Sequence, residues 1–98
     1  MKILILQGPN LNMLGKRKAE HYGVETLDEI HKRMVERANS LGAELILYQS
    51  NHEGNLVEKI HAERESVEGI IVNPAGLTGF GYSLRDAIED SGLPAIEV

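Results

Sequence analysis

Short apolar runs alternate along this chain with longer segments in which apolar residues recur at helical spacing. Four runs rich in Ile, Leu and Val are typical of buried parallel strands, and they occupy residues 2–6, 43–48, 69–72 and 94–98. Three segments carry apolar residues every three or four positions, as on the inward face of a helix, and they begin at Thr26, Ser50 and Ser83. The alternation predicts parallel β-α-β units with right-handed crossovers and helices on both faces of one sheet.

Local signals mark where the predicted helices begin and end. Thr26 followed by Glu29 forms a capping box, in which each side chain satisfies a free backbone amide of the other residue. Ser50 and Glu53 repeat that pattern at the start of the second helix. Gly92 is a natural stop for the third helix, because glycine readily takes the left-handed conformation. With 98 residues, the chain is expected to form one domain.

The loops that follow the predicted strands are rich in polar groups. In parallel sheets of this kind, binding sites lie beyond the carboxyl ends of the strands. Three segments therefore become candidates: the loop after Leu6, the Gln49–Glu53 turn and the Asn73–Ser83 loop. The first, over residues 7–25, is long for a compact domain, and such loops are usually functional or disordered.

Composition and charge narrow the function classes. The chain has no cysteine, which excludes disulfides, thiolate metal sites and cysteine nucleophiles. Its net charge of −5 argues against nucleic-acid binding but allows a small anionic substrate. No apolar run is long enough for a membrane span and no targeting segment is recognisable, so a cytoplasmic protein is expected. His52 and His61 lack a second ligand at metal spacing, so no metal site is expected.

Arg17 and Tyr22 form the most informative pair in the first loop. A tyrosine has a reference pKa of about 10, and a cation within about 4–6 Å lowers that pKa. The two side chains could therefore form a general base that is shielded from water when the loop closes. The alternative is a surface aromatic residue beside a solvated charge, since sequence distance within a loop fixes no geometry.

Two asparagines and one aspartate extend the list of candidate site residues. Asn10 could orient a water or a substrate oxygen, or it could simply form a turn. Asn73 ends a predicted strand, where it could hydrogen-bond a substrate hydroxyl or cap the strand end. Asp86, near the start of the third helix, is interpreted as a solvated charge or as a carboxylate at the positive end of the helix dipole.

Several segments, in order along the whole chain, resemble the signature motifs of type II 3-dehydroquinate dehydratases. The matching stretches are Gly8–Gly15 with Arg17 and Tyr22–Gly23, then Gln49–Gly54, Asn73–Gly76 with Leu84–Ala87, and Ile96–Val98. Each stretch alone is a weak signal, but the ordered set is specific. The resemblance implies a flavodoxin-like three-layer α/β sandwich with a parallel sheet, of which four strands are present and a fifth is missing.

The resemblance also implies a reaction, the dehydration of 3-dehydroquinate to 3-dehydroshikimate in the shikimate pathway, without a metal or an organic cofactor. On the family pattern, Tyr22 would be the base, Arg17 would lower its pKa, and Asn10 would help to hold a water. Asn73 and Asp86 would belong to the substrate site, with Asp86 reaching the site of a neighbouring subunit. The resemblance further implies trimers, commonly four of them in a homododecamer.

The sequence departs from the family pattern in two places. Gly79 stands where the family has a histidine that binds a substrate hydroxyl. After Val98 the family continues with the histidine that acts as general acid, a fifth strand and a final helix. We therefore expect the chain to carry the residues that remove the proton and to lack the general acid, so that it shows little or no turnover. One competing hypothesis is a non-catalytic relative that keeps the fold for binding or assembly. The other is a generic flavodoxin-like regulatory domain, which is disfavoured because no acidic phosphoacceptor cluster follows the first strand.

Overall fold

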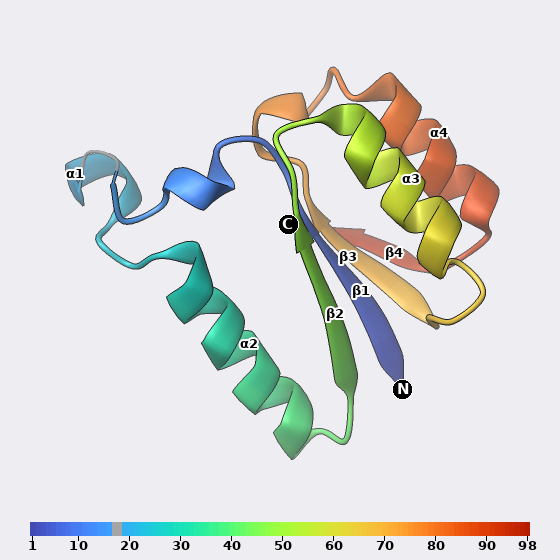
Figure 1. The fold of residues 1–98 in the computed structure, drawn as a ribbon, viewed down its shortest axis with the longest axis horizontal. Helices are drawn as coiled ribbons and strands as arrows, with labels where there is room; N and C mark the ends of the chain where they lie inside the picture. Colours follow the sequence, from blue (N-terminus) through green and yellow to red (C-terminus); the bar gives the residue numbers. More distant parts are fainter. Residues whose placement is uncertain (17–18) are drawn as a thin grey trace.

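The computed structural model describes residues 1–16 and 19–98, with the backbone but not the side chains of residues 19 and 22. A parallel sheet in the order β2-β1-β3-β4 lies between α2 on one face and α3 and α4 on the other (Figure 1). In chain order the elements are β1 (Lys2–Gln7), η1 (Leu11–Met13), α1 (Ala19–Tyr22), α2 (Leu27–Ser40), β2 (Glu44–Gln49), α3 (Glu53–Glu63), β3 (Gly69–Asn73), η2 (Ala75–Leu77), α4 (Tyr82–Ser91) and β4 (Ala95–Glu97). The predicted three-layer α/β architecture is confirmed.

Alternation of side chains along β1 explains why this strand reads as a continuous apolar run. Leu4 and Leu6 are fully buried in the main core, which they share with residues of α3 and α4. Ile3 and Ile5 line an apolar cavity on the opposite face, beneath α2. A strand that is covered on both faces needs apolar side chains at every position, as in other parallel sheets.

The helix ends follow two of the predicted signals. The Glu29 amide donates to the Thr26 hydroxyl oxygen over 3.2 Å, and the Thr26 amide donates to the Glu29 carboxylate over 3.3 Å. This reciprocal pair is the predicted capping box, and it fixes the start of α2. α4 ends at Ser91, and Gly92 caps it with a left-handed backbone of φ 71°, as predicted.

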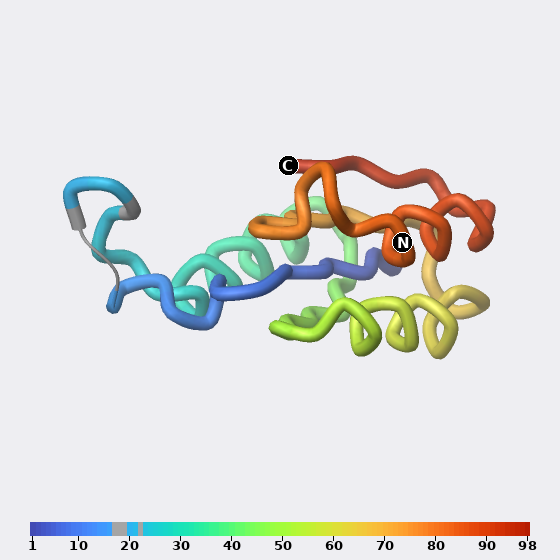
Figure 2. Tube along the Cα trace, turned by 90° about the horizontal axis from the view of Figure 1, so that it is seen from above, coloured from blue at the N-terminus to red at the C-terminus, as the bar shows by residue number. Residues whose placement is uncertain are grey.

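The loop predicted over residues 7–25 contains η1 and α1, and α1 lies at one end of the molecule, away from the sheet (Figure 2). The loop closes where Gly15 meets Thr26: a Cβ on Gly15 would lie 2.8 Å from the Thr26 methyl carbon. Arg33 of α2 donates two hydrogen bonds to Glu25, over 2.7 and 2.6 Å, and these bonds lower the pKa of Glu25. The returning end of the loop is therefore tied to α2.

Candidate functional site

The loops after β1 and β3 meet at the carboxyl edge of the sheet. Gln7 and Asn73, the last residues of the two strands, stand in register. The Gly8 amide donates to the Asn73 carbonyl oxygen over 2.8 Å. A Cβ on Gly8 would lie only 2.4 Å from the Pro74 carbonyl oxygen, so glycine is required for this close approach. The two loops are thereby held in direct backbone contact.

Asn10 forms the turn that leaves β1. Its backbone is left-handed, with φ of 71°, a conformation that asparagine tolerates better than most residues. Its amide donates to the side-chain oxygen of Asn51 over 2.8 Å. Gln49 donates from its side-chain amide both to Asn51 and to the Gly8 carbonyl, each over 3.1 Å. The turn interpretation is confirmed, and Gln49 and Asn51 are the residues that hold the turn in place.

Asn73 closes the end of β3. Its side-chain oxygen accepts a hydrogen bond of 3.1 Å from the Ala75 amide, which confirms its interpretation as a strand-end cap. Ala75 has a positive φ of 50°, so this bond stabilises a turn that alanine alone disfavours. Within the described part of the chain, the Asn73 side-chain nitrogen makes no hydrogen bond, so its two N–H donors are available to a ligand.

The capping box predicted at Ser50 and Glu53 is wrong. α3 starts at Glu53 with His52 as its N-cap, so Ser50 lies too far from the helix to cap it. The Ser50 hydroxyl oxygen instead accepts from the His52 amide over 3.0 Å and from the Asn55 side chain over 3.1 Å. The Glu53 carboxylate turns to a different helix and accepts a hydrogen bond of 3.0 Å from the Leu84 amide of α4.

The remaining predicted site residues lie on α4 or outside the described residues. Asp86 is exposed in the second turn of α4, which starts at Tyr82 and has no acidic residue in its first turn. The interpretation of Asp86 as a charge at the positive end of the helix is therefore wrong, because the dipole effect fades within the first turn. Arg17 and the side chain of Tyr22 lie outside the described residues.

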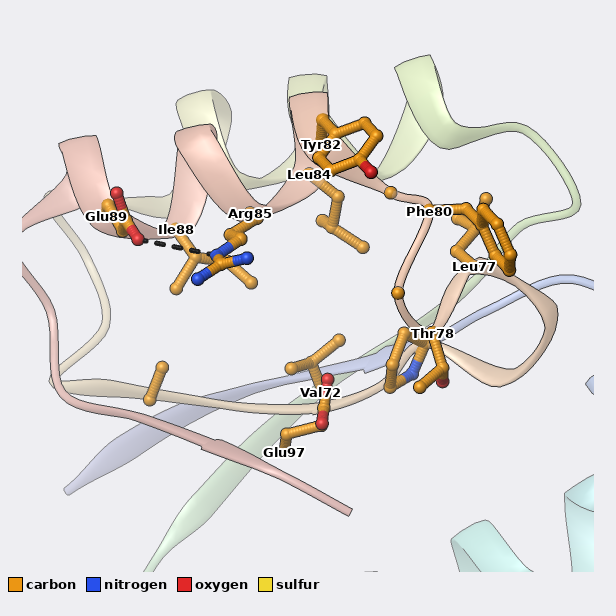
Figure 3. A pocket seen from close by; sticks show the side chains of 14 residues that line it. Val72, Leu77, Thr78, Phe80, Tyr82, Leu84, Arg85, Ile88, Glu89 and Glu97 are labelled. Carbon is orange, nitrogen blue, oxygen red and sulfur yellow. Dashed lines mark ion pairs between the residues drawn. The ribbon is translucent and has the colours of Figure 1, made fainter.

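A cavity of about 490 Å³ lies between α4 and the ends of β3 and β4 (Figure 3). Val72, Leu84 and Ile88 form an apolar wall. The Arg85 side chain points from α4 toward the strands and pairs with Glu89 over 3.7 Å. Glu97 also lines the cavity, so its apolar wall is bordered by one cation and two carboxylates.

One end of this cavity is formed by the segment where the sequence departs from the family pattern. Gly79 has φ of +80°, and a Cβ built on it would meet no atom of the described residues within 4 Å. Phe80 and Tyr82 line the same end, and both are exposed. The space around the Gly79 Cβ position is therefore open, with no side chain of the described residues filling it.

A second cavity, of about 480 Å³, lies on the α2 side of the carboxyl edge, with Asn12, Lys16 and Asp28 among its lining residues. His31 of α2 also lines this cavity and contacts the buried Gln7 side chain, with 3.3 Å between their Nε2 atoms. Burial lowers the pKa of His31, and the nearby Asp28 carboxylate partly opposes that effect. His31 is thus a neutral contact to the strand end at physiological pH, a role that sequence periodicity did not reveal.

No cluster of three or more histidine, aspartate or glutamate side chains in residues 1–16 and 19–98 is arranged to hold a metal ion. Among the same residues, no helix is long and apolar enough to cross a membrane.

Comparison with known proteins relates the chain and its fold to one family. A family model described as dehydroquinase class II matches residues 1–98. The 3-dehydroquinate dehydratase of Herpetosiphon aurantiacus is 52% identical over 98 residues, which cover 100% of this chain and 68% of that protein. The corresponding enzyme of Roseiflexus castenholzii is also 52% identical over 98 residues, covering 100% of this chain and 62% of that protein.

A solved structure agrees with these relatives. The crystal structure of type II dehydroquinase from Butyrivibrio crossotus matches with a TM-score of 0.94 at 38% identity, over 99% of this chain and 68% of that chain. The chain thus spans 62–68% of the length of these relatives. Because the family model and the relatives match along its whole length, the chain belongs to the class II dehydroquinase family.

Proposed function

We propose that this chain carries the base and part of the substrate site of a 3-dehydroquinate dehydratase, which converts 3-dehydroquinate to 3-dehydroshikimate. The observation that carries the proposal is the meeting of the Asn10 turn and Asn73 at the ends of adjacent strands, joined by the 2.8 Å hydrogen bond from Gly8 to Asn73. Ligand sites of doubly wound sheets lie at this edge. Curated relatives named 3-dehydroquinate dehydratase support the choice of substrate.

The reaction removes a proton and a hydroxyl group from neighbouring carbons of the substrate ring. The base takes the proton from the carbon beside the ketone, and the C–H electron pair forms an enolate. The enolate expels the β-hydroxyl group, which takes up a proton and leaves as water, and a C=C bond conjugated with the ketone remains. Hydrogen-bond donors near the enolate oxygen lower the barrier, because negative charge develops there.

The polar residues of the first loop suit the early steps of this reaction. Tyr22 is proposed as the base, with Arg17 lowering the pKa of its phenol. Asn10 is proposed to hold a water near the enolate oxygen, and within the described residues its side chain makes no hydrogen bond that would compete. Asn73 is proposed to donate from its free side-chain nitrogen to a substrate hydroxyl. A phenolate and amide donors supply this chemistry without a metal or an organic cofactor.

Assembly and location form part of the same proposal. The exposed Asp86 on α4 is proposed to reach the substrate site of a neighbouring subunit. This contact requires a homo-oligomer, for which we propose trimers that combine into a homododecamer. We further propose that the protein acts in the cytoplasm, in the shikimate pathway that leads to aromatic amino acids.

A direct assay tests the proposal. The purified chain is mixed with 3-dehydroquinate, and the ultraviolet absorbance of the conjugated enone product is followed. Tyr22→Phe should lower the rate by about 10²–10⁴-fold, the usual contribution of a general base. Tyr48→Phe is the matched control, because Tyr48 lies in β2 with its ring 5.3 Å from the Lys59 ammonium and should leave the rate unchanged.

The outcomes separate an enzyme from a non-catalytic relative. A rate that falls in Tyr22→Phe but not in Tyr48→Phe supports dehydration with Tyr22 as the base. An equal fall in both variants would contradict that role. Absence of turnover together with binding of 3-dehydroquinate would favour the binding relative, for which the open space at Gly79 is the specific structural argument. Absence of both turnover and binding would overturn the proposal.

A further inference from the structure

α4 begins without a cap of its own. Its N-cap is Gly81, which has no side chain to accept a hydrogen bond, and no acidic residue lies in its first turn. The first amides of an α-helix have no partner within the helix, and a capping side chain from Ser, Thr, Asp or Asn usually satisfies one of them. The amino end of α4 therefore depends on a group from elsewhere in the fold.

Glu53 supplies that group from the first position of α3. Its carboxylate accepts a hydrogen bond of 3.0 Å from the Leu84 amide, although the two residues are 31 positions apart. A Cβ on Gly81 would be crowded by the Leu77 side chain, at 3.2 Å, but would meet the Glu53 carboxylate oxygen only at an ordinary contact distance of 3.5 Å. A half-buried carboxylate at a helix amino terminus gains from both the charged hydrogen bond and the helix dipole.

The same first turn of α4 forms part of the cavity wall in Figure 3. Gly81, Tyr82 and Leu84 all line the cavity, and the first intrahelical hydrogen bond runs from the Arg85 amide to the Gly81 carbonyl over 3.0 Å. The position at which α4 begins therefore sets where Arg85 lies relative to the strands. It also sets the direction in which the Asp86 side chain extends from α4.

We propose that Glu53 is a positioning residue that fixes the first turn of α4, and with it Arg85 and Asp86, relative to the cavity at the carboxyl edge. Leu84 and Ala87 are buried and anchor the body of α4 independently of the carboxylate. Loss of Glu53 should therefore leave the helix packed on the sheet but release its first turn. The predicted consequence for ligand binding rests on the proposed function, with 3-dehydroquinate as the ligand.

Three variants of the full chain test this role. Glu53→Ala removes the acceptor, whereas Glu53→Gln keeps a side-chain oxygen and removes the charge. Glu58→Ala is the matched control, because Glu58 is exposed on the same helix and has no hydrogen bond or ion pair within the described part of the chain. Amide hydrogen exchange, backbone amide chemical shifts, the Tm and the Kd for 3-dehydroquinate are measured for each variant.

Glu53→Ala should speed exchange at the Leu84 amide about tenfold, as expected for a lost charged hydrogen bond. It should also shift the amide signals of Gly79, Tyr82 and Arg85 and weaken binding of 3-dehydroquinate about tenfold. Glu53→Gln should recover part of each effect. Glu58→Ala should match the wild-type chain in all of them.

Two results would overturn the proposal. One is an unchanged exchange rate at Leu84 in Glu53→Ala, which would mean that the carboxylate does not cap α4. The other is faster exchange with unchanged signals from the cavity residues, which would limit Glu53 to a local cap. If the wild-type chain fails to bind 3-dehydroquinate, the proposed function fails, while the exchange rates and chemical shifts still decide the role of Glu53. If Glu53→Ala does not fold, Glu53→Gln provides the same comparison.

Discussion

The two faces of the sheet are packed to different depths. On the face covered by α3 and α4, the buried core includes Leu56 and Ile60, both with 0% exposure. On the face covered by α2, Ala38 is the only buried residue of that helix, and Met34 is half-buried. An apolar cavity of about 370 Å³ lies between α2 and the strands on this second face.

This difference shows where the stability of the fold originates. Two helices exclude water from the first face, so each side chain there contributes close to its full burial energy. The single helix on the second face leaves β3 only partly covered, and Ile71 borders the apolar cavity. The candidate site lies at the carboxyl edge where both faces end, so the first face is its rigid support.

Truncation of one side chain on each face gives the largest expected effects. Ile60→Ala should lower the free energy of unfolding by about 2–5 kcal/mol, because it leaves a cavity in a closely packed core. Met34→Ala should lower it by roughly 1 kcal/mol or less, because the side chain is half-exposed beside an existing cavity. Chemical denaturation of both variants measures the difference. Equal losses would show that the two faces contribute equally.

The layers of the fold were predictable from sequence because they depend on local patterns. The apolar runs gave all four strands to within a few residues, since strands buried on both faces leave a continuous signal. The Thr26–Glu29 capping box was predictable because both partners belong to one helix. The Ser50–Glu53 box has the same sequence pattern, yet Glu53 bonds to Leu84. Sequence spacing alone could not distinguish a partner in the same turn from one in another helix.

The candidate site was predictable in its location but not in its contacts. The rule for parallel sheets placed Asn10 and Asn73 at the same edge, and in the register of β1 and β3 Asn73 stands opposite Gln7, the last residue before the Asn10 turn. The side-chain bonds of Gln49 and Asn51 to the first loop were missed, since residues 41 positions apart in sequence leave no periodic signal. The pairing of Arg17 with Tyr22 stays a prediction.

A pair of glycine substitutions extends the comparison to the edge where both faces end. Gly8→Ala should lower the free energy of unfolding by roughly 1–3 kcal/mol, because its Cβ would lie 2.4 Å from the Pro74 carbonyl oxygen and force the two loops apart. Gly76→Ala is the matched control: its Cβ would meet nothing within 4 Å among the described residues, and its φ is not positive. We expect that control to lie within about 0.5 kcal/mol of the wild-type chain. A Gly8→Ala chain as stable as the control would contradict the tight contact between the loops.

The smallest expected effect is a pH dependence that belongs to the α2 face alone. The buried residues of the core on the α3/α4 face are all aliphatic, whereas His31 contacts Gln7 beneath α2. Because burial lowers the pKa of His31 from its ordinary value of 6.5, the unfolded chain binds more protons below that pH. The stability that neutral His31 provides is therefore present above pH 6.5 and is lost as the pH falls through the lowered pKa.

Two histidine variants isolate this contribution. Asp28 and Lys16 line the same cavity as His31 and are present in both proteins, so the difference between wild type and His31→Gln reports on the histidine itself. The wild-type chain should lose more stability than His31→Gln between about pH 7.5 and pH 5, and His61→Gln, changed on the exposed surface of α3, should follow the wild type. Parallel losses in the wild type and His31→Gln would show that the α2 face is insensitive to this titration. Chemical denaturation at several pH values measures both losses. If they are parallel, the two faces of the sheet differ in depth of packing but not in their response to protons.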